Sequence, residues 1–186
     1  MRKTMVIGIA GGSASGKSTF SGKLAEALQD LQVMELHMDL YFKAPEERPL
    51  AAAPVGGKIY RDDNHPLTCD LPRLEQDLAA AVNSGQYQVI IVEGLLTLWD
   101  EKIQDRLDLR LFVDCPPDER IVRRLKRNMT WGLSFDEIAD VYLDLVRYRH
   151  NEYVEPTKWK ADFIVNGSHF SPRALDMLAL YIRSMI

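Results

Sequence analysis

Short runs of apolar residues alternate along the chain with segments in which apolar positions recur every three or four residues. The runs have the length of buried strands, and the segments between them have the period of helices that pack on a sheet. This alternation is typical of a parallel β-sheet covered by helices. The expected strands are Met5–Ala10, Val33–His37, Val89–Val92, Leu109–Asp114 and Asp162–Val165. The expected helices are Lys17–Leu31, Pro72–Asn83, Leu96–Leu107, Asp118–Met129, Phe135–Tyr153 and Pro172–Met185.

Local start signals support three of these helices. Asp70 stands before Leu71-Pro72 and Ser171 stands before Pro172. Each supplies a capping side chain ahead of a proline that has no amide hydrogen to satisfy. Ser134 and Glu137 have the spacing of a capping box, in which the two residues satisfy each other's free amides.

One long segment interrupts the alternation. Residues 44–68 contain four prolines, two glycines and three consecutive alanines. Connections of more than about 15 residues are uncommon in compact domains and are usually binding loops or disordered. We therefore expect a partly mobile substrate loop.

Composition narrows the class of protein. The 186 residues are 46% hydrophobic and 27% charged, which is typical of one ordinary folded domain and not of a disordered chain. The net charge of −4 gives no overall attraction for nucleic acid or an anionic membrane, so a bound anion needs a local site. The apolar run Met5–Ala10 is too short for a spanning helix or a signal peptide, which predicts a cytoplasmic protein. Cys69 and Cys115 lack metal-ligand spacing and are expected to be reduced thiols.

The strongest chemical signal is a phosphate-binding loop between the first strand and the first helix. Its residues match G-x-x-x-x-G-K-[ST] and are Gly11, Gly12, Ser13, Ala14, Ser15, Gly16, Lys17, Ser18 and Thr19. Small residues let successive amides point at phosphate oxygens, and the following helix adds the positive end of its dipole. Lys17 is expected to reach the terminal phosphates of a bound nucleotide, and the Ser18 hydroxyl is expected to bind Mg²⁺.

Other residues distinguish between classes of nucleotide-binding protein. The late segment Thr157-Lys158-Trp159-Lys160 lacks the aspartate of the guanine-reading N-K-x-D motif, which argues against a GTPase. The third strand ends in Glu93-Gly94 rather than the Asp-Glu pair of a motor ATPase. Glu93 therefore fits a metal ligand better than a residue that activates water.

A further carboxylate and two arginines point to phosphoryl transfer. Asp39 follows the second strand, and the ends of parallel strands face the ligand crevice, so we interpret Asp39 as the base for an attacking hydroxyl. His37 beside it is interpreted as a packing residue. Arg124 and Arg127 are three apart and share a helix face, where they can offset transition-state charge.

Motifs along the whole chain resemble those of the uridine kinase and phosphoribulokinase family of P-loop kinases. Besides the phosphate loop they are M-D-L-Y-F-K, N-H-P-L-T-C-D, V-E-G-L-L, L-F-V-D, R-R-L-K-R and Y-V-E-P-T-K-W-K-A-D-F-I-V. The resemblance implies one P-loop NTPase domain over residues 1–186, with α/β/α layers, a five-stranded parallel sheet and a helical lid at about 118–134. It also implies that ATP is the co-substrate and that Asn166-Gly167 lies near adenine. The residues expected around Mg²⁺ are Ser18, Asp39 and Glu93, and Asp39, Lys17 and Arg124 are the expected catalytic residues, with Arg127 in ATP binding.

The departures from the family concern the acceptor. The hairpin that reads the pyrimidine in uridine kinases is missing, because Asn83-Ser84-Gly85-Gln86 runs almost directly into the next strand. Asn64 replaces the family's ribose-binding aspartate, and Trp131-Gly132-Leu133 replaces an arginine-containing lid segment. A site that reads a base needs its reading groups present.

The predicted function is therefore an ATP-dependent kinase for the hydroxyl of a small molecule. A nucleoside such as uridine or cytidine is the leading candidate for the acceptor. The alternatives are another small alcohol, such as a sugar or a vitamin-like compound, and a catalytically silent ATP-binding regulatory module. No nucleic acid or membrane partner is expected, and the oligomeric state stays open. Candidate acceptor-binding residues are Tyr41, Lys43, Tyr60, Arg61 and His65.

Overall fold

Five parallel strands form the centre of the structure, a computed structural model that describes residues 4–186. They are β1 (Met5–Gly11), β2 (Val33–His37), β5 (Val89–Glu93), β6 (Leu109–Asp114) and β7 (Phe163–Asn166). Their order in the sheet is β2-β5-β1-β6-β7, so the first strand of the chain lies in the middle. All five strands predicted from the sequence are present to within one residue at each end, and the α/β class is confirmed.

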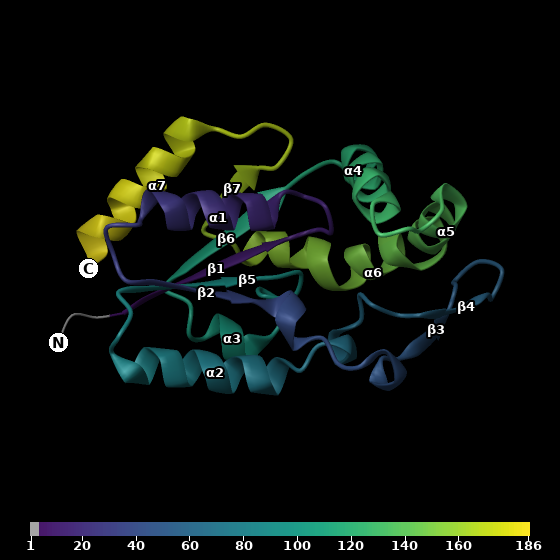
Figure 1. The fold of residues 1–186 in the computed structure, drawn as a ribbon, viewed down its shortest axis with the longest axis horizontal. Helices are drawn as coiled ribbons and strands as arrows, with labels where there is room; N and C mark the ends of the chain where they lie inside the picture. The colour runs from purple at the N-terminus through teal and green to yellow at the C-terminus, as the bar shows by residue number, and fades with distance from the viewer. Residues whose placement is uncertain (1–3) are drawn as a thin grey trace.

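Helices cover both faces of this sheet (Figure 1). α1 (Lys17–Ala27) and α7 (Pro172–Met185) lie on one face, and α2 (Leu71–Ser84) and the short α3 (Glu101–Gln104) lie on the other. Side chains of β1 alternate between the two cores. Ile7 and Ile9 are fully buried with the helices of the first face, whereas Val6 and Ala10 are buried with α2.

The predicted helix starts are confirmed by their caps. Asp70 accepts a hydrogen bond from the Arg73 amide, and Ser171 accepts one from the Ala174 amide. Ser134 and Glu137 form the predicted capping box at the start of α5 (Phe135–Val141). The first helix is shorter than predicted, because α1 ends at Ala27 rather than at Leu31.

The predicted helix Leu96–Leu107 is wrong in extent, because only residues 101–104 are helical there. Leu96 and Leu98 are both buried although they are two positions apart, and such residues point to opposite sides of a helix. The chain forms turns rather than a helix at Leu96 and Leu98, and this backbone allows both side chains to be buried. The helix begins only after Asp100, whose side chain accepts a hydrogen bond from the Ile103 amide.

The predicted helix Phe135–Tyr153 is helical throughout but is not one regular α-helix. After α5 the chain forms π-helical turns at Tyr142–Val146 and His150–Val154, separated by α6 (Arg147–Arg149), and it ends in a 3₁₀ helix at Glu155–Lys160. The buried residues explain this, because they recur every fourth position: Ile138, Tyr142, Val146, His150 and Val154. An α-helix of 3.6 residues per turn would rotate this series away from the core, and the wider π turns keep it there.

The segment 44–68 contains a β-hairpin that the sequence did not predict. β3 (Leu50–Ala52) pairs antiparallel with β4 (Ile59–Arg61). The Tyr60 hydroxyl donates a hydrogen bond of 2.6 Å to Asp144, and the Lys58 amine lies 3.6 Å from Asp140. The hairpin and α5 thus lie together at one end of the molecule (Figure 1). None of the helices in residues 4–186 has the length and apolar character that crossing a bilayer requires.

Histidine burial predicts a pH dependence of stability. His150 is buried, and desolvation together with the nearby Arg120 lowers its pKa from 6.5 to about 4, against the attraction of Glu155 and Asp114. Between these two pKa values the unfolded chain binds a proton that the folded chain does not. The contribution of neutral, buried His150 to the free energy of unfolding is therefore complete above about pH 6.5. It is lost as the pH falls toward 4, by at most about 1.4 kcal/mol per pH unit.

Urea unfolding at pH 7 and at pH 4.5 measures this contribution. We expect the His150→Gln protein to lose less stability between the two pH values than the native protein does. His169→Gln is the matched control, because it makes the same change at an exposed histidine. Equal pH dependence in all three proteins would contradict the expectation.

Candidate active site

The phosphate loop leaves the end of β1 and turns directly into α1. Gly16 precedes the helix with a φ of 97°, and no side chain caps the first turn. The amides of that turn are therefore available to an anion. Ala14 in the same loop also has a positive φ, of 62°, which costs energy for a residue with a Cβ and is typical of functional sites.

A buried carboxylate lies beneath the loop. Glu93, at the end of β5, accepts a hydrogen bond of 3.0 Å from the Ser18 hydroxyl, and the Lys17 amine is 3.5 Å from the same oxygen. The other oxygen of Glu93 is 3.2 Å from Nδ1 of His37. His37 and Glu93 are register partners on neighbouring parallel strands, so both side chains reach the same face. The sequence did not predict this contact of His37.

Asp39 lies in a 3₁₀ turn, Met38–Tyr41, that follows β2 directly. Its side chain is exposed and lines a cavity together with Lys17 and Arg127. Because β1, β2 and β5 end at the same edge of the sheet, Asp39 and Glu93 lie on the side of the phosphate loop.

Four arginines of α4 (Pro117–Met129) form one face of that helix toward the loop. Their spacing is i, i+3, i+4 and i+7, and they are Arg120, Arg123, Arg124 and Arg127. Arg124 and Arg127 both donate to the Ser13 hydroxyl, at 2.9 and 3.4 Å. A Cβ on Gly12 would lie 2.6 Å from Nη1 of Arg120, so this glycine lets the guanidinium approach the loop. Arg124 and Arg127 are the two arginines predicted from the sequence, and the same spacing also brings Arg120 and Arg123 to this face.

Two of these guanidinium groups lack full compensation. Burial, with a contribution from Arg127, lowers the pKa of Arg124, and burial also lowers the pKa of Arg127. The buried Nε of Arg124 has no hydrogen-bond partner among residues 4–186. A desolvated guanidinium with a second positive group three residues further along the helix, both beside a phosphate loop, is suited to an anionic ligand.

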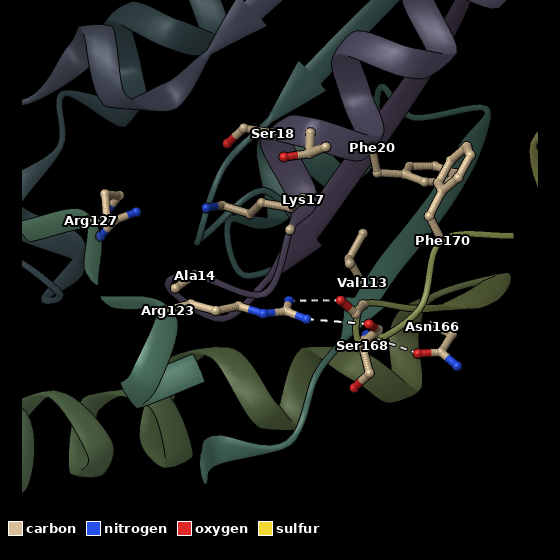
Figure 2. A pocket seen from close by; sticks show the side chains of 13 residues that line it. Ala14, Lys17, Ser18, Phe20, Val113, Arg123, Arg127, Asn166, Ser168 and Phe170 are labelled. Atoms are coloured by element: carbon tan, nitrogen blue, oxygen red, sulfur yellow. Dashed lines mark hydrogen bonds between the residues drawn. The ribbon is translucent and has the colours of Figure 1, made fainter. Parts of the chain in front are cut away.

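Two cavities meet at the loop. The first, of about 570 Å³, extends from the loop to the segment 166–170. Figure 2 shows Lys17 and Arg127 at one end of it and Phe20 and Phe170 at the other. Arg123 donates to the Gly167 carbonyl at 2.8 Å and so fixes the segment at the cavity wall (Figure 2).

The second cavity, of about 460 Å³, contains Asp39 and lies between the phosphate loop, α4 and the α5 region. Lys17 and Arg127 line both cavities. Two ligands bound side by side in these cavities would therefore share one lysine and one arginine at their junction.

Of the five candidate acceptor residues, Arg61 alone lines the second cavity. Tyr41 is buried and donates to Asp77, and Tyr60 donates to Asp144. His65 accepts from the Leu67 amide and packs its ring against Tyr153, and Lys43 also lies outside the lining. The other residues that line this cavity are not among the predicted ones, and they include Asp63, Asn64, Leu95, Trp131, Leu133 and Ile138.

Ser18 and Glu93 provide oxygen ligands for a metal ion beside the phosphate loop. The Ser18 hydroxyl and the Glu93 carboxylate are hard donors of the kind that Mg²⁺ prefers, and Asp39 lines the neighbouring cavity. Residues 4–186 contain no cluster of three or more His, Cys, Asp or Glu side chains that would hold a metal by itself. The donor set therefore fits a Mg²⁺ ion that takes its remaining ligands from phosphate and water.

A parallel sheet with a phosphate loop after its central strand is the architecture of a P-loop NTPase. A solved shikimate kinase from Bacteroides thetaiotaomicron has the same fold, with a TM-score of 0.55, 16% identity and 97% of each chain covered. Residues 60–174 match the model of the Phosphoribulokinase / Uridine kinase family. The chain is 33% identical to uridine kinase of Geobacillus kaustophilus and 32% identical to that of Bacillus licheniformis, with all of this chain and 96% of each relative covered. The chain belongs to the phosphoribulokinase/uridine kinase family.

This membership confirms the family and the class of enzyme expected from the sequence. The protein is a phosphotransferase with an alcohol group as acceptor.

Proposed function

We propose that this kinase transfers the γ-phosphoryl group of ATP to the hydroxyl of a small molecule, with a nucleoside as the leading candidate. The observation that carries the proposal is the junction of the two cavities at Lys17 and Arg127. Direct transfer requires the attacking hydroxyl and the leaving oxygen to lie roughly in line on opposite sides of the γ-phosphorus, so the two binding sites must be adjacent. The names of the similar uridine kinases support a nucleoside acceptor.

The first cavity is the proposed nucleotide site. The free amides of the loop and the Lys17 amine bind the phosphates, and Arg124 and Arg127 neutralise charge that develops during transfer. The base lies toward the segment 166–170, where the family resemblance puts adenine and where Phe20 and Phe170 line the wall. The volume of the cavity is in the usual range for small-molecule sites.

The second cavity is the proposed acceptor site, with Asp39 as the base. Its carboxylate orients the acceptor hydroxyl and takes its proton as the oxygen attacks phosphorus. When bound, Mg²⁺ would supply charge neutralisation on the phosphate oxygens. Ser18 and Glu93 would hold it, with Asp39 as the third proposed ligand.

Mass spectrometry of reaction mixtures tests the proposal. The purified protein is incubated with ATP, Mg²⁺ and separate nucleosides, sugars and vitamin alcohols. We expect a phosphorylated product from at least one nucleoside, and ATP consumption that depends on that acceptor. Asp39→Asn protein purified in the same way controls for contaminating kinases. ATP binding without any product would favour a regulatory ATP-binding module and contradict the proposal.

A further inference from the structure

The second cavity is lined by both polar and apolar side chains. The turn after β2, the last residue of β4 and the segment after it contribute Asp39, Arg61, Asp63 and Asn64, and the helical region contributes a group of apolar side chains beside Arg124, Arg127, Asn128 and Glu137. The apolar residues come from the segment between α4 and α5, from α5 and from the π-helical turn after it: Trp131, Leu133, Ile138, Val141, Leu145 and Val146. Only four residues, 85–88, connect α2 to β5, so that connection contributes no wall here.

Trp131 is the largest of these apolar side chains and lies in the turn after α4. Its ring is stacked on the Arg127 guanidinium, with the Cζ atom 5.1 Å from the ring centroid. The side chain is nevertheless 65% exposed. The guanidinium contact orients a flat and polarisable surface in the cavity that contains Asp39, and most of that surface is free to take a ligand.

We infer that Trp131 is the platform on which a planar ring of the acceptor stacks while the acceptor hydroxyl reaches Asp39. The inference rests on the proposed function and narrows it to one class of acceptor: a hydroxyl compound with an aromatic or heteroaromatic ring, and not an open-chain or sugar alcohol. Stacking recognises the face of any such ring, so it replaces a base-reading hairpin without reading particular base edges. Trp131 is thus a specificity-determining residue that sits in the position of the missing lid arginines.

A competing role for Trp131 is to hold Arg127 in place. Arg127 lines both cavities and donates to Ser13 of the phosphate loop. A residue that acted through Arg127 would change kcat and the KM for ATP. A stacking platform changes the affinity for the acceptor and leaves the KM for ATP unaltered.

Fluorescence titration in the absence of ATP tests binding without turnover. The probes are uridine, cytidine, adenosine and pyridoxine, which carry rings, and ribitol, which does not. We expect at least one ring-bearing probe to quench the emission of the native protein and ribitol to leave it unchanged. The quench disappears in Trp131→Leu and persists in Trp159→Leu, a matched control whose indole is 82% exposed and lies outside both cavities.

Steady-state kinetics with the same variants completes the test. Trp131→Leu is expected to raise the KM for the ring-bearing acceptor by about 5- to 150-fold, the range for loss of one stacked ring. Trp131→Phe restores most of the affinity because it restores a ring. Failure of every ring-bearing probe to quench, a quench that survives in Trp131→Leu, or a change confined to kcat and the KM for ATP would each overturn the inference.

The two proposals fail in different ways. Quenching that depends on Trp131 without any phosphorylated product leaves the platform intact and contradicts the kinase reaction. Phosphorylation of ribitol or of a sugar with an unchanged KM in Trp131→Leu supports the kinase reaction and overturns the platform.

Discussion

Asp39→Asn is expected to lower kcat by at least about 100-fold and to leave the affinity for ATP nearly unchanged. Asparagine has almost the same shape but does not accept the proton of the acceptor hydroxyl, and general-base catalysis contributes about 10² to 10⁴ in rate. Asp39 lines the second cavity and is not part of the first, so the proposed nucleotide site keeps its walls. Single-turnover kinetics separates the chemical step from ATP binding, which is measured by calorimetry.

Asp63→Asn is the matched control for this change. Asp63 lines the same cavity, and its carboxylate pairs with Arg48 at 3.1 Å and with Arg61 at 3.4 Å. The control removes one negative charge from the acceptor site without removing the proposed base, and we expect it to retain turnover within about tenfold. Near-normal turnover in Asp39→Asn, or an equal loss in Asp63→Asn, would remove Asp39 from its proposed role.

Regular local signals explain why much of the fold follows from the sequence. β1 and β5 and most of β6 are apolar runs because these strands are covered on both faces, and such runs can be recognised without knowledge of tertiary contacts. The caps at Asp70, Ser134 and Ser171 act within three residues, so they are also visible locally. The phosphate loop is also visible locally, because its glycines, Lys17 and Ser18 have a fixed spacing directly after an apolar strand.

The errors arise where distant contacts decide the local structure. The sequence predicts a helix over 96–107, but Leu96 and Leu98 are both buried in a non-helical turn segment that follows β5. The β3–β4 hairpin consists of three-residue strands with exposed Leu50 and Ile59, and bonds to Asp140 and Asp144 attach it to the helical region. A tyrosine hydroxyl can donate to a ligand or to another side chain, and residue type alone does not tell which. The hydroxyl of Tyr60 donates to Asp144.

The acceptor site shows the same limit. The candidates that the sequence predicts for it lie in or beside the motifs, whereas the apolar side chains that line it come from the segment between α4 and α5, from α5 and from the π-helical turn after α5. The sequence predicts one helix over Phe135–Tyr153 and does not indicate where π-helical turns interrupt it. Leu145 and Val146, which line the cavity that also contains Asp39, lie in one of these π-helical turns.

Arg124→Gln is expected to lower kcat by about 10³-fold or more. Arginines that neutralise transition-state charge contribute about 10³ to 10⁵ in phosphoryl transfer, and the Nη1 atom of Arg124 donates to Ser13 of the phosphate loop at 2.9 Å. Lys126→Gln, which removes one charge from an exposed position of the same helix, is the matched control and should retain turnover.

Folding stability gives the Arg124 prediction a second, independent measurement. The guanidinium is largely desolvated, burial lowers its pKa, and its Nε has no partner among the described residues. Such a group costs stability unless an anion compensates it. The thermal midpoint of Arg124→Gln without ligand should therefore equal or exceed that of the native protein, and the increase in midpoint on adding ATP and Mg²⁺ should be smaller. A variant with a lowered midpoint and undiminished turnover would mean that Arg124 is structural, and the burial of an unpaired positive charge beside the loop would then need another cause.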